Sequence, residues 1–223
     1  MKNINNITLL IMLFITVLST NALASAGGGA HLEHAGNNIL DQESLQKGAV
    51  LFATRCMSCH SVKYMRYNRV AKDLGWTDEE VLKKLGKTRN KVVDNMMGSM
   101  NDTTAMAAFG TKIPDLSLMA RLKGSDYIYS FLRGFELDMK KGKWDNKYLP
   151  GTAMPNIMMK PNDPKALEQY DKDTRDLVNF LEYVGEPAKM KRYDLGWKVM
   201  LFLFIMFIFA YLLKREYWKD IKH

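Results

Sequence analysis

The feature that most constrains this chain is a short run, Cys56-Met57-Ser58-Cys59-His60, which contains both of its cysteines. The C-x-x-C-H spacing is that of a c-type haem attachment site. Two residues between the cysteines allow both sulfurs to bond to the vinyl groups of one porphyrin, and the histidine that follows lies beneath the iron. We therefore predict one covalently bound haem c, held by Cys56 and Cys59, with His60 as the proximal iron ligand.

Two other kinds of site use a C-x-x-C pair, and the sequence disfavours both. A thioredoxin-like redox pair needs a βαβ context, and a structural zinc site needs further ligands. The chain has two cysteines in all, so no second pair is left for a zinc site or a structural disulfide. Haem attachment is the interpretation that we keep.

Length and composition allow one sizeable domain with extra segments. The chain has 223 residues, of which 47% are hydrophobic and 25% charged, and its formal net charge is +8. A basic chain can bind nucleic acid, but the lysines and arginines are scattered and form no recognition-helix or interleaved aromatic pattern. We expect no nucleic-acid partner.

The N-terminal residues 1–24 have the pattern of a signal peptide. A lysine supplies a positive charge, Ile7–Leu18 is a short apolar run, and small residues place the cleavage site near Ala24 or Ala26. The apolar run is too short to favour a membrane helix. A mitochondrial transit peptide would be rich in arginine, whereas the first arginine here is Arg55. We therefore expect bacterial export to the periplasm.

Hydrophobic periodicity and capping signals predict an all-α fold. We expect a class I cytochrome c-like haem domain with loop insertions over residues 25–194, in the periplasm, followed by one C-terminal transmembrane helix. Residues 87–110 show little periodicity. The predicted helices are Asp41–Arg55, in which Gly48 allows close approach by another helix; Thr77–Leu85, with a Thr-x-x-Glu capping box; Ser125–Phe135; and a helix capped by Asp173-Thr174 and ended by Gly185 and Pro187.

The second face of the iron needs a ligand, and a thioether is the usual partner of histidine in such a haem. Met154 lies in the loop Tyr148–Pro155, which has a proline on each side of this methionine. A preorganised loop holds a ligand better than a mobile segment does. We predict Met154 as the second iron ligand, with Met158 and Met159 as rivals.

Four further residues are predicted to lie around the haem. Pro114 fixes its own backbone angle and has no amide proton, which suits a rigid wall against a flat ligand. Arg121 and Lys123 are candidates for ion pairs with the haem propionates, because a charge-assisted bond is stronger than a neutral one. Tyr127, in the helix that follows, is also included among the haem-binding candidates.

The C-terminal segment has the character of a membrane anchor. Val199–Leu213 contains no charged residue, and tryptophans and tyrosines flank it. This core is shorter than the roughly 20 residues that usually span a bilayer, so Lys198 must extend its head group to the interface. We predict a transmembrane anchor at 195–213 and a cytoplasmic tail at 214–223, after a charged linker at 189–194. Basic residues flank both ends, so the orientation depends on the export signal.

Taken in order, these motifs resemble those of the cytochrome c1 family, the haem subunits of ubiquinol:cytochrome c oxidoreductase (complex III). The resemblance runs from about Ser44 to the C-terminus. It is carried by the run Cys56–His60, Pro114-Asp115-Leu116-Ser117, Asp126-Tyr127, Ala153-Met154-Pro155, Phe180-Leu181 with Tyr183, Glu186-Pro187 and the C-terminal anchor. Two positions depart from the family pattern: Ile113 stands where many members have a first proline, and Lys123 where an arginine often meets a propionate.

The resemblance implies an electron relay, a redox subunit that is no enzyme on its own. In that role the haem accepts an electron from a Rieske iron–sulfur subunit and passes it to a soluble cytochrome c or equivalent carrier, beside a cytochrome b subunit. We expect a single-pass protein of the bacterial inner membrane. Two alternatives share parts of the pattern: the anchored cytochrome c subunit of a terminal oxidase, and a haem peroxidase or gas sensor, which needs an open sixth position on the iron.

Overall fold

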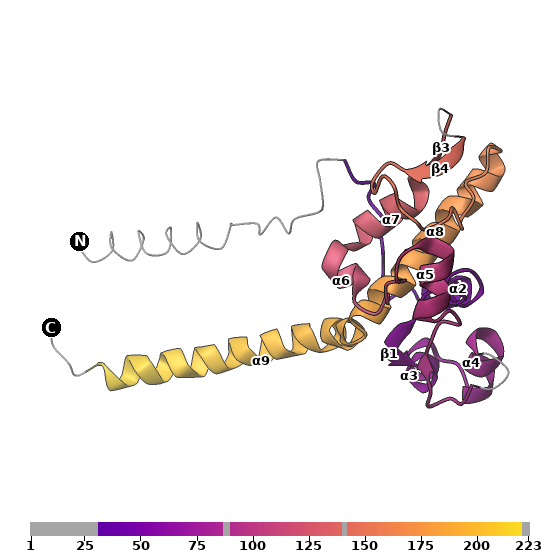
Figure 1. The fold of residues 1–223 in the computed structure, drawn as a ribbon. Helices are drawn as coiled ribbons and strands as arrows, with labels where there is room; N and C mark the ends of the chain where they lie inside the picture. The colour runs from indigo at the N-terminus through magenta and orange to yellow at the C-terminus, as the bar shows by residue number, and fades with distance from the viewer. Residues whose placement is uncertain (1–30, 87–89, 140–141, 220–223) are drawn as a thin grey trace. The chain divides into compact units, whose positions relative to one another are not determined.

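A computed structural model of the chain describes residues 31–86, 90–139 and 142–219. The predicted signal peptide, with its cleavage site near Ala24 or Ala26, lies outside the described residues, as do the last four residues of the predicted tail. The elements are α2 (Gln42–Leu51), η1 (Phe52–Cys56), β1 (Val62–Arg66), α3 (Tyr67–Leu74), α4 (Asp78–Leu85), β2 (Asn95–Met96), α5 (Asp102–Phe109), α6 (Met119–Lys123), α7 (Ser125–Arg133), β3 (Phe135–Asp138), β4 (Lys143–Asn146), α8 (Pro164–Gly185) and α9 (Ala188–Tyr217) (Figure 1).

The all-α prediction is confirmed as a fold class. In the described part of the chain, the strands form two small antiparallel sheets, β1 with β2 and β3 with β4. Their pairings join Val62 to Met96 and Phe135 to Asn146. The sheets are too small to organise the domain, and helices supply most of its core.

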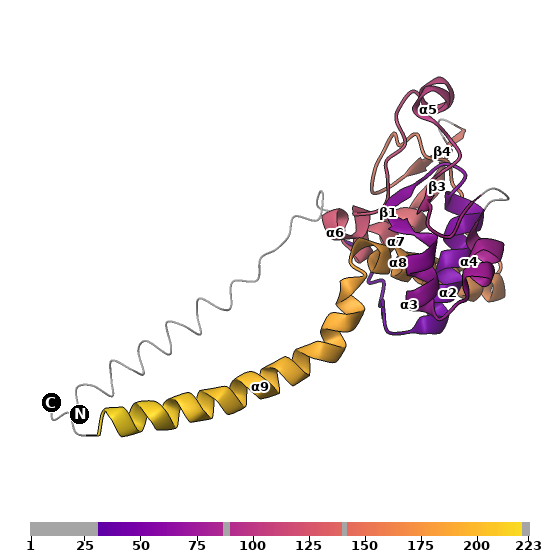
Figure 2. The ribbon, with the colours of Figure 1, turned by 90° about the horizontal axis from the view of Figure 1, so that it is seen from below.

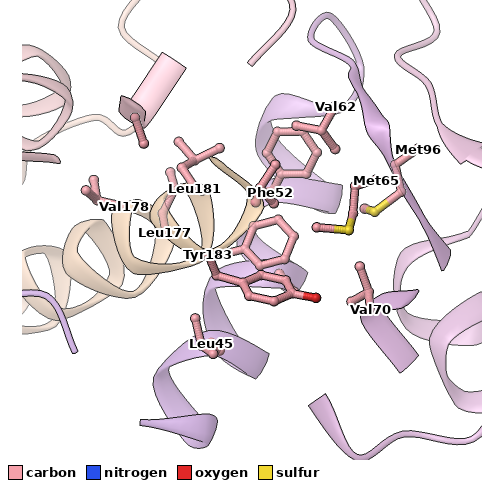
Figure 3. Close-up of a cluster of buried hydrophobic side chains, with 14 of the residues drawn as sticks. Leu45, Phe52, Val62, Met65, Val70, Met96, Leu177, Val178, Leu181 and Tyr183 are labelled. Carbon is pink, nitrogen blue, oxygen red and sulfur yellow. The ribbon is translucent and has the colours of Figure 1, made fainter. Parts of the chain in front are cut away.

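The core forms where α2 and η1 pack against α8. Figure 3 shows buried side chains of these helices meeting apolar side chains from β1, β2 and α3. The ring centroids of Phe52 and Phe180 are 5.7 Å apart, and those of Phe180 and Tyr183 are 6.0 Å apart. Helix α2 also contacts α3 and α4, which lie beside it in Figure 2. The turn Cys56–His60, which we call the haem turn, therefore follows directly from the best-packed helix pair of the domain.

The capping box predicted at Thr77 is confirmed. The Thr77 hydroxyl accepts a hydrogen bond from Glu80 N at 3.2 Å, and the Glu80 carboxylate accepts one from Thr77 N at 2.8 Å. Both contacts satisfy amides that have no partner within the helix. Helix α4 then ends at Leu85, as predicted from the glycine that follows.

The predicted start of the last helix of the domain is wrong. Helix α8 begins at Pro164, and the side chain of Asp163 caps it by accepting from Ala166 N at 2.9 Å. Thr174 lies inside this helix, fully buried, and its hydroxyl donates to Tyr170 O at 2.7 Å. The first turns of α8 are largely exposed, so the apolar repeat that we used to place the helix starts only in its second half.

The first predicted helix of the domain differs from the observed structure near its end. The helix expected to reach Arg55 changes after Leu51 into one turn of π-helix, η1, in which Met57 N donates to Phe52 O at 2.9 Å. Turns of this kind occur often at functional sites.

Within 87–110, where periodicity is weak, the structure contains α5, capped by the Asn101 side chain. This helix is mostly exposed and so has no apolar stripe.

Helix α9 runs from Ala188 to Tyr217, and among the described residues it is the one helix long and apolar enough to cross a membrane. The predicted linker at 189–194 is wrong, because these residues form the first turns of α9. Their charges support the helix, as in the pair between Lys198 Nζ and Asp194 Oδ2 at 3.1 Å, four residues apart. The predicted anchor at 195–213 therefore lies within a longer helix.

Candidate functional site

The haem-attachment motif forms a tight turn after η1. Cys59 N and His60 N both donate to Cys56 O, at 3.0 and 2.8 Å. Cys56, Cys59 and His60 line one cavity of about 580 Å³, within the usual range for small-molecule and cofactor sites, about 300 to 1,000 Å³. The two thiols and the imidazole predicted to bind one group therefore face the same space.

The His60 ring is held by the segment that follows α5. Its Nδ1 lies 2.9 Å from Pro114 O. A carbonyl oxygen only accepts, so Nδ1 carries the proton and Nε2 keeps the lone pair that a metal needs. Burial lowers the pKa of His60, opposed by the Pro114 hydrogen bond and by the charge of Asp115. A neutral imidazole with its second nitrogen hydrogen-bonded is the usual form of a histidine ligand.

Cys56 is half-buried in the cavity wall, and desolvation there raises the pKa of its thiol to about 12. The charge of Arg55 acts in the opposite direction but is the weaker influence. A site that disfavours a thiolate suits a thioether, which carries no charge. This environment also argues against a reactive redox thiol, which needs a lowered pKa.

The loop 149–155 forms another part of the cavity wall and brings Met154 to it. The loop is tied to β4 by Asp145, whose carboxylate accepts from Gly151 N at 2.7 Å. The two rival methionines line a separate hollow: Met158 is 7% exposed, and Met159 is 74% exposed. Of the three predicted candidates, Met154 is the one that shares a cavity with His60.

The other predicted haem-binding residues divide between two places. Pro114, Lys123 and Tyr127 line the cavity, and Lys123 Nζ lies 5.6 Å from the Tyr127 ring centroid. Arg121 is not among the lining residues. Its Cγ lies 3.3 Å from where a Cβ on Gly185 would stand, so its stem packs at the end of α8.

Two cations in the cavity wall, Arg55 and Lys112, were missed by sequence reasoning. With Lys123 they are the charged residues that line it, and within the described residues no aspartate or glutamate does so. Lys112 also pairs with Asp102 at 2.8 Å. Arg55 precedes Cys56 directly, which is a local signal that could have found it. Lys112 has no such signal, because only the fold brings the segment after α5 into the wall of the cavity that the motif lines.

The cavity fits a haem by the chemistry of its donors and walls. Two sulfurs for thioether bonds, an imidazole and a thioether line one space, whose remaining wall is mostly apolar and includes Phe131 and Leu181. The cationic lining suits a group with carboxylates at its edge. Cys56 and Cys59 would hold the porphyrin, and His60 and Met154 the iron.

These features define a c-type cytochrome domain followed by a C-terminal membrane helix. The chain belongs to the cytochrome c1 family, whose model matches residues 33–221. Members of this family carry one covalently attached c-type haem and are anchored in the membrane by a C-terminal helix, and both predictions are confirmed for this chain.

Individual relatives agree with this assignment. The chain is 38% identical to "Cytochrome c1" of Allochromatium vinosum, over 95% of this chain and 98% of that protein. It is 35% identical to a Nitrosomonas europaea protein named "Ammonia monooxygenase gamma subunit", over 94% of this chain and 97% of that protein. A solved structure titled "Hyperthermophilic respiratory Complex III" covers 99% of this chain and 98% of its own, with a TM-score of 0.50 and 21% identity, which supports the fold alone.

Proposed function

We propose that this chain is the electron-transfer subunit of a quinol:cytochrome c oxidoreductase, complex III. The observation that carries the proposal is one cavity lined by Cys56, Cys59, His60 and Met154 in a member of the cytochrome c1 family. When bound, the haem supplies a one-electron couple between ferric and ferrous iron. No acid, base or nucleophile is needed, so the subunit is no enzyme on its own.

The chain's own residues hold the redox group and tune it. Cys56 and Cys59 fix the porphyrin covalently. His60 donates Nδ1–H to Pro114 O, which orients the ring and makes Nε2 a stronger donor. The Met154 sulfur stabilises the reduced state of the iron and raises its potential. Apolar side chains limit water around the site, and two ligands fixed by the protein leave no position for a substrate.

For the propionates, Lys123 is better placed than Arg121, because Lys123 lines the cavity. Pro114 and Tyr127 form part of the wall. Arg55 and Lys112 add positive charge to the same cavity. We assign the carboxylate contacts to Lys123 with Arg55 or Lys112, and we give Arg121 a packing role at α8.

The proposed partners are a cytochrome b subunit, a Rieske iron–sulfur subunit as electron donor, and a soluble cytochrome c-type acceptor. One relative is named for a different assembly, an ammonia monooxygenase. Gentle detergent purification from the source membrane, followed by identification of the attached subunits, tests this proposal. We expect a dihaem cytochrome b and a Rieske protein; terminal oxidase or monooxygenase subunits in their place would contradict it.

We further propose a place in the bacterial inner membrane, with the haem domain (25–194) in the periplasm and the tail (214–223) in the cytoplasm after cleavage of 1–24. The export signal and the anchor at 195–213 support this orientation. Protease added to intact spheroplasts should digest the haem domain and leave a C-terminal epitope protected. Digestion of the epitope instead would reverse the orientation.

A haem peroxidase or gas sensor is the alternative from another class. It requires an exchangeable ligand on one face of the iron, whereas Met154 fills that face in our proposal. The intact reduced protein should therefore bind carbon monoxide slowly or not at all. Rapid binding would favour the sensor or peroxidase.

A further inference from the structure

The residue that follows the haem motif, Ser61, connects the haem turn to two other segments of the chain. Its hydroxyl oxygen accepts a hydrogen bond from Gly98 N at 2.8 Å. Its carbonyl oxygen accepts another from Leu116 N, also at 2.8 Å. The first contact reaches the chain just after β2, and the second reaches the segment that carries Pro114.

The segment after β2 runs back along the haem turn. Val62 pairs with Met96, and Ser99 N donates to Met57 O at 3.2 Å. Gly98 lies between these two contacts. The main chain of residues 96–99 therefore contacts the haem turn near its start, at Met57, and the first residue of β1, Val62.

Gly98 stands against the backbone of the motif itself. A Cβ at this position would lie 2.8 Å from Cys59 O and 2.9 Å from both His60 C and His60 O. These are main-chain atoms, so no side-chain rotation relieves the overlap. A residue with a side chain at 98 therefore has to displace the turn that carries Cys59 and His60.

Ser61 also sets the register between the His60 ring and its hydrogen-bond acceptor. The ring donates to Pro114 O, and Leu116, two residues further on, donates to Ser61 O. The same short segment is therefore fixed to the turn at two points. The contact between the Ser61 hydroxyl and Gly98 N adds a further anchor, and without it we expect the bond from His60 Nδ1 to Pro114 O to become weaker.

We propose that Ser61 and Gly98 are positioning residues that hold the haem turn so that His60 keeps its hydrogen bond to Pro114 and its orientation toward the iron. This inference rests on the proposed haem site. A second partner that accepts a proton from a ligating imidazole raises the basicity of that ligand. A weaker bond makes His60 a poorer donor, which favours ferrous iron and raises the reduction potential.

The test compares haem-loaded full-length variants purified in detergent. In Ser61→Ala we expect retained haem, a midpoint potential above that of the wild type, and shifted g-values in the ferric electron paramagnetic resonance spectrum. Thr103→Ala, which removes an exposed hydroxyl on α5, should change neither the midpoint potential nor the g-values. A Ser61→Ala potential equal to or below the wild-type value would overturn the inference while leaving the proposed haem function intact. Wild-type protein that carries no haem would overturn both this inference and the proposed haem function.

Gly98→Ala provides the second variant. The overlap with the motif backbone predicts a smaller fraction of covalently loaded protein, and shifted g-values in the fraction that loads. Gly196→Ala is the matched control, since nothing lies within 4 Å of a Cβ built there. Normal loading with wild-type spectra in Gly98→Ala would contradict the inference.

A measurement on the wild-type holoprotein does not depend on how any variant folds. The amide protons of Gly98 and Leu116 both donate to Ser61, so each should exchange with solvent at least about tenfold more slowly than in an unstructured peptide. Exchange at the unstructured rate at both positions would overturn the inference.

Discussion

Gly48 on α2 lies against the main chain of Asp176 on α8, so closely that a Cβ on Gly48 would stand 1.9 Å from Asp176 O and 2.8 Å from Phe180 Cβ. The two helix backbones are therefore in direct contact at this crossing. Because η1 continues α2 to Cys56, and Leu177 and Leu181 of α8 line the haem cavity, the crossing sets the position of the haem turn relative to that wall.

Gly48→Ala should destabilise the haem domain. The added methyl overlaps a carbonyl oxygen that cannot rotate away, so the helices must separate and the core around Phe52 and Phe180 must loosen. Overpacking of this kind costs about 3 kcal/mol of unfolding free energy. Denaturant unfolding, followed by haem absorbance, measures the loss. Gly196→Ala should not lower stability, since its Cβ meets no neighbour within 4 Å. Equal midpoints for Gly48→Ala and the wild type would show that the crossing tolerates a side chain.

Met154→Ala should remove the ferric absorption band that reports an iron–thioether bond. Loss of the sulfur also removes a ligand that favours ferrous iron, so the midpoint potential should fall, by on the order of 0.1 V or more of the roughly 0.8 V range that axial ligands control. Met159→Ala is the control, because Met159 is 74% exposed and lines a separate hollow. If the band survives in Met154→Ala, another residue is the ligand.

Glu182 should contribute a pH-dependent share of stability. It accepts hydrogen bonds from Asn37 at 2.9 Å, Ser125 at 2.8 Å and Lys189 at 2.5 Å. Burial alone would raise its pKa, but these three contacts outweigh burial and hold the pKa below its ordinary value of 4.5. A carboxyl whose pKa is lower in the folded state stabilises fully above its unfolded pKa and loses that effect as pH falls through the folded one.

Glu182→Gln should therefore lose about 2 kcal/mol of unfolding free energy near pH 7, since hydrogen bonds to a charged group are among the stronger ones. The gap to the wild type should shrink once the pH falls below the ordinary pKa of 4.5. Denaturant unfolding of both proteins above and below that pH measures this difference in unfolding free energy. Glu168→Gln, at an exposed position of the same helix, should change little at either pH. A gap that is independent of pH would mean that the charge of Glu182 does not stabilise the fold.

Thr77→Ala should cost about 1 kcal/mol, the usual effect of removing an N-cap side chain. The Glu80 amide then loses its partner, and Glu80 loses half of the reciprocal box. Thermal unfolding of the holoprotein measures the change, with Thr103→Ala on α5 as the reference substitution. No difference between these variants would show that the α4 cap adds nothing to global stability.

Local signals predicted much of the fold and site. The capping box at Thr77, the end of α8 at Gly185 and the close approach at Gly48 were all readable, because each depends on neighbouring residues or on one backbone property. The start of α8 was readable too, since Asp163 before Pro164 is a common helix beginning, but the apolar repeat begins later and led to Thr174. The α5 helix carries no apolar stripe and was missed.

The sequence alone determined the covalent chemistry, because Cys56, Cys59 and His60 are neighbours in the chain and their spacing matches one porphyrin. It also determined the membrane anchor, which needs only a long apolar run. Tertiary structure decided which methionine and which cations share the haem cavity. The prolines around Met154 and the charge of Lys123 marked both as candidates, but only packing and loop geometry bring them, together with Lys112, into one cavity with the haem motif.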